Sequence, residues 1–110
     1  MLQVEVGVPG ARTRIPLSRI DWRPANRGHK NPLRGPAAHA GRFLPDSHLH
    51  TFALNWLPQA SAMRAGNLPF AVDLPAFVDT LDALFDFAGF VFRIDHMTMI
   101  EMPPWLPRLL

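Results

Sequence analysis

His48 and His50 stand two residues apart, and a third histidine, His29, lies upstream in a turn-like segment that ends at Pro32. Alternate side chains of a β-strand leave the same face, so the imidazoles of His48 and His50 would lie about 6–7 Å apart. Imidazole titrates near neutral pH, so one ring can act as general base while the other acts as general acid across a phosphodiester. We therefore predict that His48 and His50 form a catalytic pair. His29 and Asn31 would assist, with Asn31 hydrogen-bonding a ring or a developing oxyanion.

A metal centre is the second chemistry that this spacing allows. Two imidazoles can chelate an ion, but a complete site needs a third and usually a fourth ligand, which His29, His39 or Asp46 would have to supply. No spacing here is a strong metal signature. A cupin-like site needs a glutamate shortly after the pair, where residues 53–55 are Ala, Leu and Asn, and a histidine-triad hydrolase needs a histidine where Phe52 stands. The sequence therefore predicts no metal ion and no cofactor.

A structural role is the third alternative for the histidine pair. His48 and His50 would then cap the open end of a core-facing strand and hydrogen-bond the long loop 23–46. In that case the rings would hold the loop down and take part in no reaction.

Positive charge is concentrated in the first half of the chain. Residues 1–55 contain eight of the eleven basic residues and three of the nine acidic ones, whereas residues 56–110 contain three basic and six acidic residues. A basic half of this kind favours a surface that faces a polyanion. We predict that four basic side chains near His29 bind phosphates of a nucleic acid. These are Arg23, Arg27, Lys30 and Arg34.

The composition indicates one small domain. The chain has 110 residues, 48% of them hydrophobic, which is enough to build a core. It has no cysteine, so disulfides and thiolate metal sites are excluded. The first residues lack the pattern of a signal peptide, and no apolar run is long enough to span a membrane. We expect a cytoplasmic protein without a membrane partner.

The first half of the chain predicts two strands and a long loop. Apolar residues alternate over residues 2–8, and a turn at Pro9-Gly10 leads to a second strand over about 12–22. Pro16 removes a hydrogen-bond donor from that second strand, which must therefore be bulged or at an edge. The segment 23–46 is rich in proline and glycine and predicts a long irregular loop.

The second half predicts two further strands, a helix and a last strand. The strands cover residues 48–57 and 68–74. Apolar spacing predicts a helix from Pro75 to Ala88, which Gly89 would end, followed by a strand over residues 90–100.

The resulting fold class is α+β. We predict a mostly antiparallel sheet of four or five strands with one helix on one face, in the order β-β-β-β-α-β. This domain would cover residues 1–101. The apolar, proline-rich segment 102–110 would fold back over the sheet or meet a partner, which includes a homodimer through this segment.

Four separate motifs resemble those of a group of small uncharacterised bacterial and phage-associated proteins. The resemblance covers about residues 13–95. It is carried by Arg19-Ile20-Asp21, by Gly28-His29-Lys30-Asn31-Pro32, by Ser47-His48-Leu49-His50-Thr51-Phe52, and by Phe70-Ala71-Val72-Asp73 before a helix. It implies a toxin, an anti-defence protein or a host-takeover factor of a phage or mobile element.

Two functions from different classes follow. The first is a small phage or mobile-element protein that acts on nucleic acid, as a metal-independent ribonuclease or toxin with a histidine pair. The alternative is a non-enzymatic, anti-CRISPR-like inhibitor or adaptor that binds a host protein complex.

Overall fold

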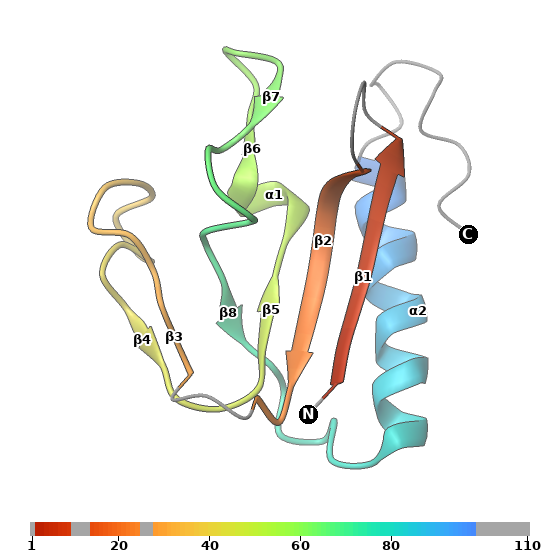
Figure 1. Cartoon of the computed structure of the whole chain (residues 1–110). Helices are drawn as coiled ribbons and strands as arrows, with labels where there is room; N and C mark the ends of the chain where they lie inside the picture. Colours follow the sequence, from red (N-terminus) through yellow and green to blue (C-terminus); the bar gives the residue numbers. More distant parts are fainter. Residues whose placement is uncertain (1, 10–13, 25–27, 99–110) are drawn as a thin grey trace.

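An antiparallel sheet of four strands, in the order β1-β2-β5-β8, forms the centre of the structure (Figure 1). The computed structural model describes residues 2–9, 14–24 and 28–98. The two longest strands, β1 (Leu2–Pro9) and β2 (Arg14–Trp22), pair as a hairpin. Their register shifts between Val6 and Gly7, opposite Pro16, so the bulge predicted for a strand that contains proline is present.

The remaining elements are short, apart from one long helix. Two small ribbons lie outside the central sheet, and both are antiparallel pairs. In chain order the elements are β3 (His29–Lys30), β4 (Phe43–Leu44), β5 (His48–His50), α1 (Phe52–Asn55), β6 (Trp56–Leu57), β7 (Ala62–Met63), β8 (Val72–Asp73) and α2 (Leu81–Thr98).

One face of the sheet is apolar and packs on α2. Ile20 and Leu49 are cross-strand partners on this face, and both are buried with Leu84, Ala88 and Phe92 of the helix. The three helix residues recur every four positions, so one stripe of α2 faces the sheet. Each large aliphatic side chain buried in this way stabilises the fold by roughly 1.5–3 kcal/mol.

The opposite face of the same strands is polar. Side chains alternate along a strand, so the neighbours of Ile20 and Leu49 point away from α2. Arg19 lies across from His50, and Asp21 lies across from His48. All four side chains are buried. On this face of the sheet, buried charged and polar side chains therefore stand where an apolar core would otherwise be.

Two buried asparagines fix the segment that covers the polar face. Asn31 donates through Nδ2 to the Ala71 carbonyl (3.0 Å) and accepts through Oδ1 from the Ala71 amide (2.9 Å). Asn55 makes the same pair of bonds to the backbone of Phe70 (2.8 Å each). Each side chain therefore mimics a strand partner and satisfies backbone groups that no sheet reaches.

The prediction of a last strand over residues 90–100 is wrong. Helix α2 runs through Gly89 and continues to Thr98, and the two residues after it lie outside the described part of the chain. Phenylalanine, valine and isoleucine favour strands, but the buried stripe of α2 continues at helical spacing to Phe92, and burial overrides this propensity. Gly89 has a helical backbone and therefore does not end the helix. A Cβ added at this position would meet nothing within 4 Å, so the space around it does not require glycine either.

Three further boundaries differ from the predictions. The strand expected over 48–57 ends at His50, because Thr51 caps α1 by accepting from the Leu54 amide (3.1 Å). The strand expected over 68–74 is reduced to β8. The helix begins at Leu81 rather than Pro75, after Thr80 accepts from the Ala83 amide (3.1 Å).

The α+β class itself is confirmed: an antiparallel sheet carries a C-terminal helix on one face. The loop 23–46 contains the small ribbon β3–β4. Segment 102–110, with its predicted folding back or dimer contact, lies outside the described residues. Within the described part of the chain, neither helix has the length and apolar character needed to cross a membrane.

Candidate functional site

Three histidines meet on the polar face of the sheet. The ring centroids of His48 and His50 are 5.0 Å apart, and the His29 ring lies 5.4 Å from His48 and 4.8 Å from His50. One ring nitrogen from each histidine lies within 4.8 Å of the other two. The structure therefore places His48 and His50 on one strand face, as predicted. His29 joins them from the long loop.

Each ring is oriented by a backbone carbonyl. His48 donates through Nδ1 to the carbonyl of Asp46 (2.8 Å), and His50 donates through Nδ1 to the carbonyl of Leu68 (2.6 Å). His29 donates through Nε2 to the carbonyl of Pro69 (2.8 Å). A carbonyl can only accept, so each of these nitrogens carries a proton. In His48 and His50 the second nitrogen, Nε2, faces Asp21.

The backbone at one of these carbonyls is strained. Leu68 has φ +52°, a left-handed conformation that non-glycine residues seldom adopt, and its carbonyl is the one that accepts from His50. Strain of this kind persists only where the surrounding structure enforces it, and it concentrates at functional sites.

Asp21 is the anionic member of the cluster. Its Oδ2 lies 3.1 Å from Nε2 of His48 and 3.2 Å from Nε2 of His50. Its Oδ1 accepts from Nε of Arg19 at 3.0 Å. Nη2 of the same guanidinium lies 3.1 Å from Nε2 of His50 and can only donate to it. We name Arg19, Asp21, His29, His48 and His50 the histidine cluster.

The charges of the histidine cluster follow from burial and from these bonds. Burial alone would raise the pKa of Asp21, but the hydrogen bond from His48, the close contact with the His50 ring and the charge of Arg19 hold it far below its usual range. Burial alone would lower the pKa of His48, yet the bond to Asp21 and the bond to the Asp46 carbonyl raise it. For His50 burial prevails and the pKa is lowered. These shifts therefore favour the ionised form of Asp21, the protonated form of His48 and the neutral form of His50.

Two distances within the histidine cluster match those between ligands of one metal ion, and the donor atoms of the three imidazoles lie within 4.8 Å of one another. Four ligands at 2.0–2.1 Å from a tetrahedral ion lie about 3.3 Å from one another. The distances from Asp21 Oδ2 to the two Nε2 atoms are 3.1 and 3.2 Å. A backbone carbonyl on the far nitrogen of a histidine is the usual way in which proteins orient a metal-binding imidazole. Three imidazoles and a carboxylate form a donor set that suits Zn²⁺ and related divalent transition metals.

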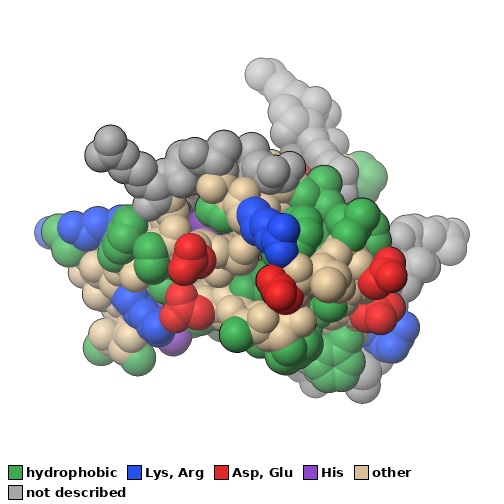
Figure 2. Space-filling model, turned by 90° about the horizontal axis from the view of Figure 1, so that it is seen from below, with side chains coloured by type: hydrophobic (Ala, Val, Ile, Leu, Met, Phe, Trp, Pro, Cys, Tyr) green, Lys and Arg blue, Asp and Glu red, His purple; other side chains and the backbone are tan. Residues whose placement is uncertain are grey.

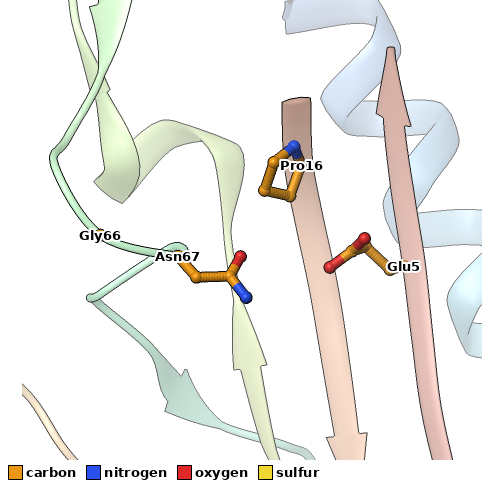
Figure 3. Close-up of a pocket in the computed structure, with 4 residues that line it drawn as sticks. All are labelled: Glu5, Pro16, Gly66 and Asn67. Carbon is orange, nitrogen blue, oxygen red and sulfur yellow. The ribbon is translucent and has the colours of Figure 1, made fainter. Parts of the chain in front are cut away.

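Access to the histidine cluster is limited. The side chain of His50 has no exposed surface, and that of His48 is 3% exposed. An open cavity of about 290 Å³ is lined by Glu5, Pro16, Gly66 and Asn67 (Figure 3). Nη1 of Arg19 lies 3.5 Å from the carbonyl of Asn67. A small ion can enter a site of this kind, whereas a nucleic-acid backbone cannot reach the rings without movement of the covering loops.

Asn31, which was predicted to assist catalysis, lies near the histidine cluster, but its side chain hydrogen-bonds to backbone groups. It is buried, and besides its two bonds to Ala71 it donates to the carbonyl of His39 (3.0 Å). All of its amide groups are occupied in holding the loop 28–46 to the segment before β8. Asn31 therefore positions the loop that carries His29.

Asn31→Asp is expected to destabilise the protein by about 3 kcal/mol or more. A carboxylate has no N–H to donate to the carbonyls of His39 and Ala71, and it places an unpaired charge in a buried site. Urea unfolding monitored by tryptophan fluorescence measures the change. The matched control is Asn67→Asp at an exposed position, and an equal loss of stability in both variants would contradict this role of Asn31.

The predicted phosphate-binding residues do not share one environment. Arg23 donates to Asp79 (3.2 Å) and stacks on the Trp22 ring (4.3 Å), while Lys30 and Arg34 are exposed. Arg27 lies outside the described residues. Arg42 and Asp73 form a second exposed pair. Acidic and basic side chains lie next to each other on the face shown in Figure 2. This face is of mixed charge rather than basic.

Sequence reasoning missed two members of the histidine cluster, Arg19 and Asp21. The available signal was that Arg19 and Asp21 alternate on a strand in the same way as His48 and His50. That alternation indicates a shared site only once β2 is known to pair with β5 in the observed register. No family model, curated protein or solved structure matches this chain.

Proposed function

We propose that this chain is a metal-binding protein whose histidine cluster holds one divalent transition-metal ion. The observation that carries the proposal is the convergence of donor atoms. Each of the three carbonyl-oriented imidazoles has a ring nitrogen within 4.8 Å of the other two, and His48 and His50 place Nε2 beside Oδ2 of Asp21. His29, His48, His50 and Asp21 would be the ligands. Before an ion binds, Arg19 orients Asp21 through Oδ1.

The ion would join three separate parts of the chain. Asp21 comes from β2, His48 and His50 come from β5, and His29 comes from the loop that covers the polar face. The binding energy of an ion held in this way adds to the folding energy. A site closed by four protein ligands would be structural, whereas displacement of His29 would open a position for water or a substrate.

Calorimetric titration of the metal-stripped protein with Zn²⁺ tests the proposal. We expect one equivalent to bind, and we expect His48→Ala and His50→Ala each to abolish tight binding. His39→Ala is the matched control, because His39 lies in the same covering loop but outside the group of converging histidines. Absence of stoichiometric binding by the folded wild-type protein, or equal binding by all four proteins, would refute the proposal.

A second candidate function is metal-independent acid–base cleavage of RNA, as predicted from the sequence. It is supported by the opposite pKa shifts of the pair: burial lowers the pKa of His50, whereas the bonds to Asp21 and to the Asp46 carbonyl raise the pKa of His48 despite burial. A neutral base beside a protonated acid is the arrangement that such cleavage needs. This candidate predicts RNA cleavage that survives a chelator and is lost in His48→Ala and His50→Ala. Cleavage lost on chelation would favour the metal centre.

A further inference from the structure

We infer that Arg19 is an internal cation that occupies the metal position of the histidine cluster in the ion-free protein and swings toward the cavity lined by Glu5 and Asn67 when an ion binds. The inference rests on the proposed metal-binding function and adds a regulatory element to that site. Arg19 would set the affinity of the site by competing with the ion.

The competition follows from a single shared lone pair. His50 uses its Nδ1 proton on the Leu68 carbonyl, so Nε2 has one lone pair to offer. Nη2 of Arg19 lies 3.1 Å from that Nε2. A bound Zn²⁺ would lie 2.0–2.1 Å from the same nitrogen, in the direction of the same lone pair. The guanidinium nitrogen and the ion therefore exclude each other.

In the absence of an ion, Arg19 compensates the negative charge of Asp21. Asp21 is a buried carboxylate, and a buried charge is stable only with a partner. Arg19 is itself buried and binds Asp21 through Nε. The guanidinium thus provides part of the positive charge that a divalent ion would bring.

The structure also offers a place for the displaced guanidinium group. Arg19 lies directly across the β1–β2 pair from Glu5, and Glu5 lines the cavity of about 290 Å³ together with Asn67 (Figure 3). Nη1 already points to the Asn67 carbonyl at 3.5 Å. A rotation about the end of the side chain can therefore carry Nη2 away from His50 and toward a second carboxylate. Because the planar guanidinium moves as one unit, its bond from Nε to Asp21 is released in this movement.

Competition titrations with Zn²⁺ and a chromophoric chelator test the inference. Removal of the competing cation in Arg19→Gln is expected to tighten zinc binding by at least tenfold. Glu5→Gln is expected to weaken it several-fold, because the displaced guanidinium loses its second carboxylate. The control is Arg93→Gln, which removes an exposed arginine from α2 and should leave the affinity unchanged.

The outcomes separate this inference from the proposed function. If the wild-type protein binds zinc but Arg19→Gln binds it equally or more weakly, the metal site stands and the role of Arg19 is refuted. If neither protein binds zinc, the metal site itself is refuted. Should Arg19→Gln fail to fold, the guanidinium resonances of Arg19 in the wild-type protein can be followed by NMR during zinc addition. The inference requires them to shift, and unchanged resonances in the zinc-bound protein would contradict it.

Discussion

Replacement of Asp21 by asparagine is expected to lower the free energy of unfolding by about 3–5 kcal/mol and to abolish metal binding. The reason for the first effect is the burial of both cationic partners. Arg19 and His48 each bind a different oxygen of Asp21, and their side chains are 10% and 3% exposed. An amide is isosteric with the carboxylate but carries no charge, so the substitution leaves these cations without an anion. Urea denaturation at neutral pH measures the loss.

An exposed ion pair provides the control for this prediction. Arg23 and Asp79 form a salt bridge whose side chains are 58% and 81% exposed. Asp79→Asn should therefore change stability by no more than about 1 kcal/mol. If Asp21→Asn were as mild as Asp79→Asn, the histidine cluster would not depend on its carboxylate, and the proposed ligand set would lose its anion.

Zinc is expected to stabilise the folded protein strongly. A ligand that binds only the folded state at a hundred times its dissociation constant adds about 2.7 kcal/mol to the free energy of unfolding. For a domain of this size, that corresponds to a rise of about 10 °C in melting temperature. Differential scanning calorimetry with and without Zn²⁺ measures the gain. His39→Ala should retain it, and His50→Ala should lose it.

The stabilisation by zinc should also depend on pH and should decrease as the pH falls. Burial lowers the pKa of His48, but the bonds to Asp21 and to the Asp46 carbonyl and the charge of Asp21 together raise it by more, so a proton competes with the ion for Nε2. Stabilisation by zinc should be greatest above the raised pKa of His48 and should decline as the pH falls through it. A gain that is independent of pH, or that also appears in His50→Ala, would indicate that zinc binds elsewhere.

The local pattern of the sequence predicted most of the central architecture. Alternation identified β1, proline identified the bulge in β2, and the histidine spacing placed His48 and His50 on one strand face. Helix α2 was predicted in part. Its second half was assigned to a strand because a short apolar run that contains phenylalanine and valine suits both elements, and only burial against the sheet decides between them.

The composition of the histidine cluster was less predictable, for a physical reason. Asp21 meets His48 through a register between strands that are far apart in the sequence, and no local pattern contains that register. Asn31 looked like a catalytic assistant because its neighbours are histidine and proline, but its amide is used entirely by the backbone. The predicted nucleic-acid or host-protein partner, and the phage association, stay predictions.

X-ray absorption at the zinc edge of the zinc-loaded protein tests the central claim most directly. If the ion lies among Asp21, His29, His48 and His50, the nearest shell must contain nitrogen and oxygen donors at about 2.0–2.2 Å. The outer shells must show the scattering of about three imidazole rings. A nearest shell of oxygen alone, with no imidazole scattering, would contradict the proposed metal centre.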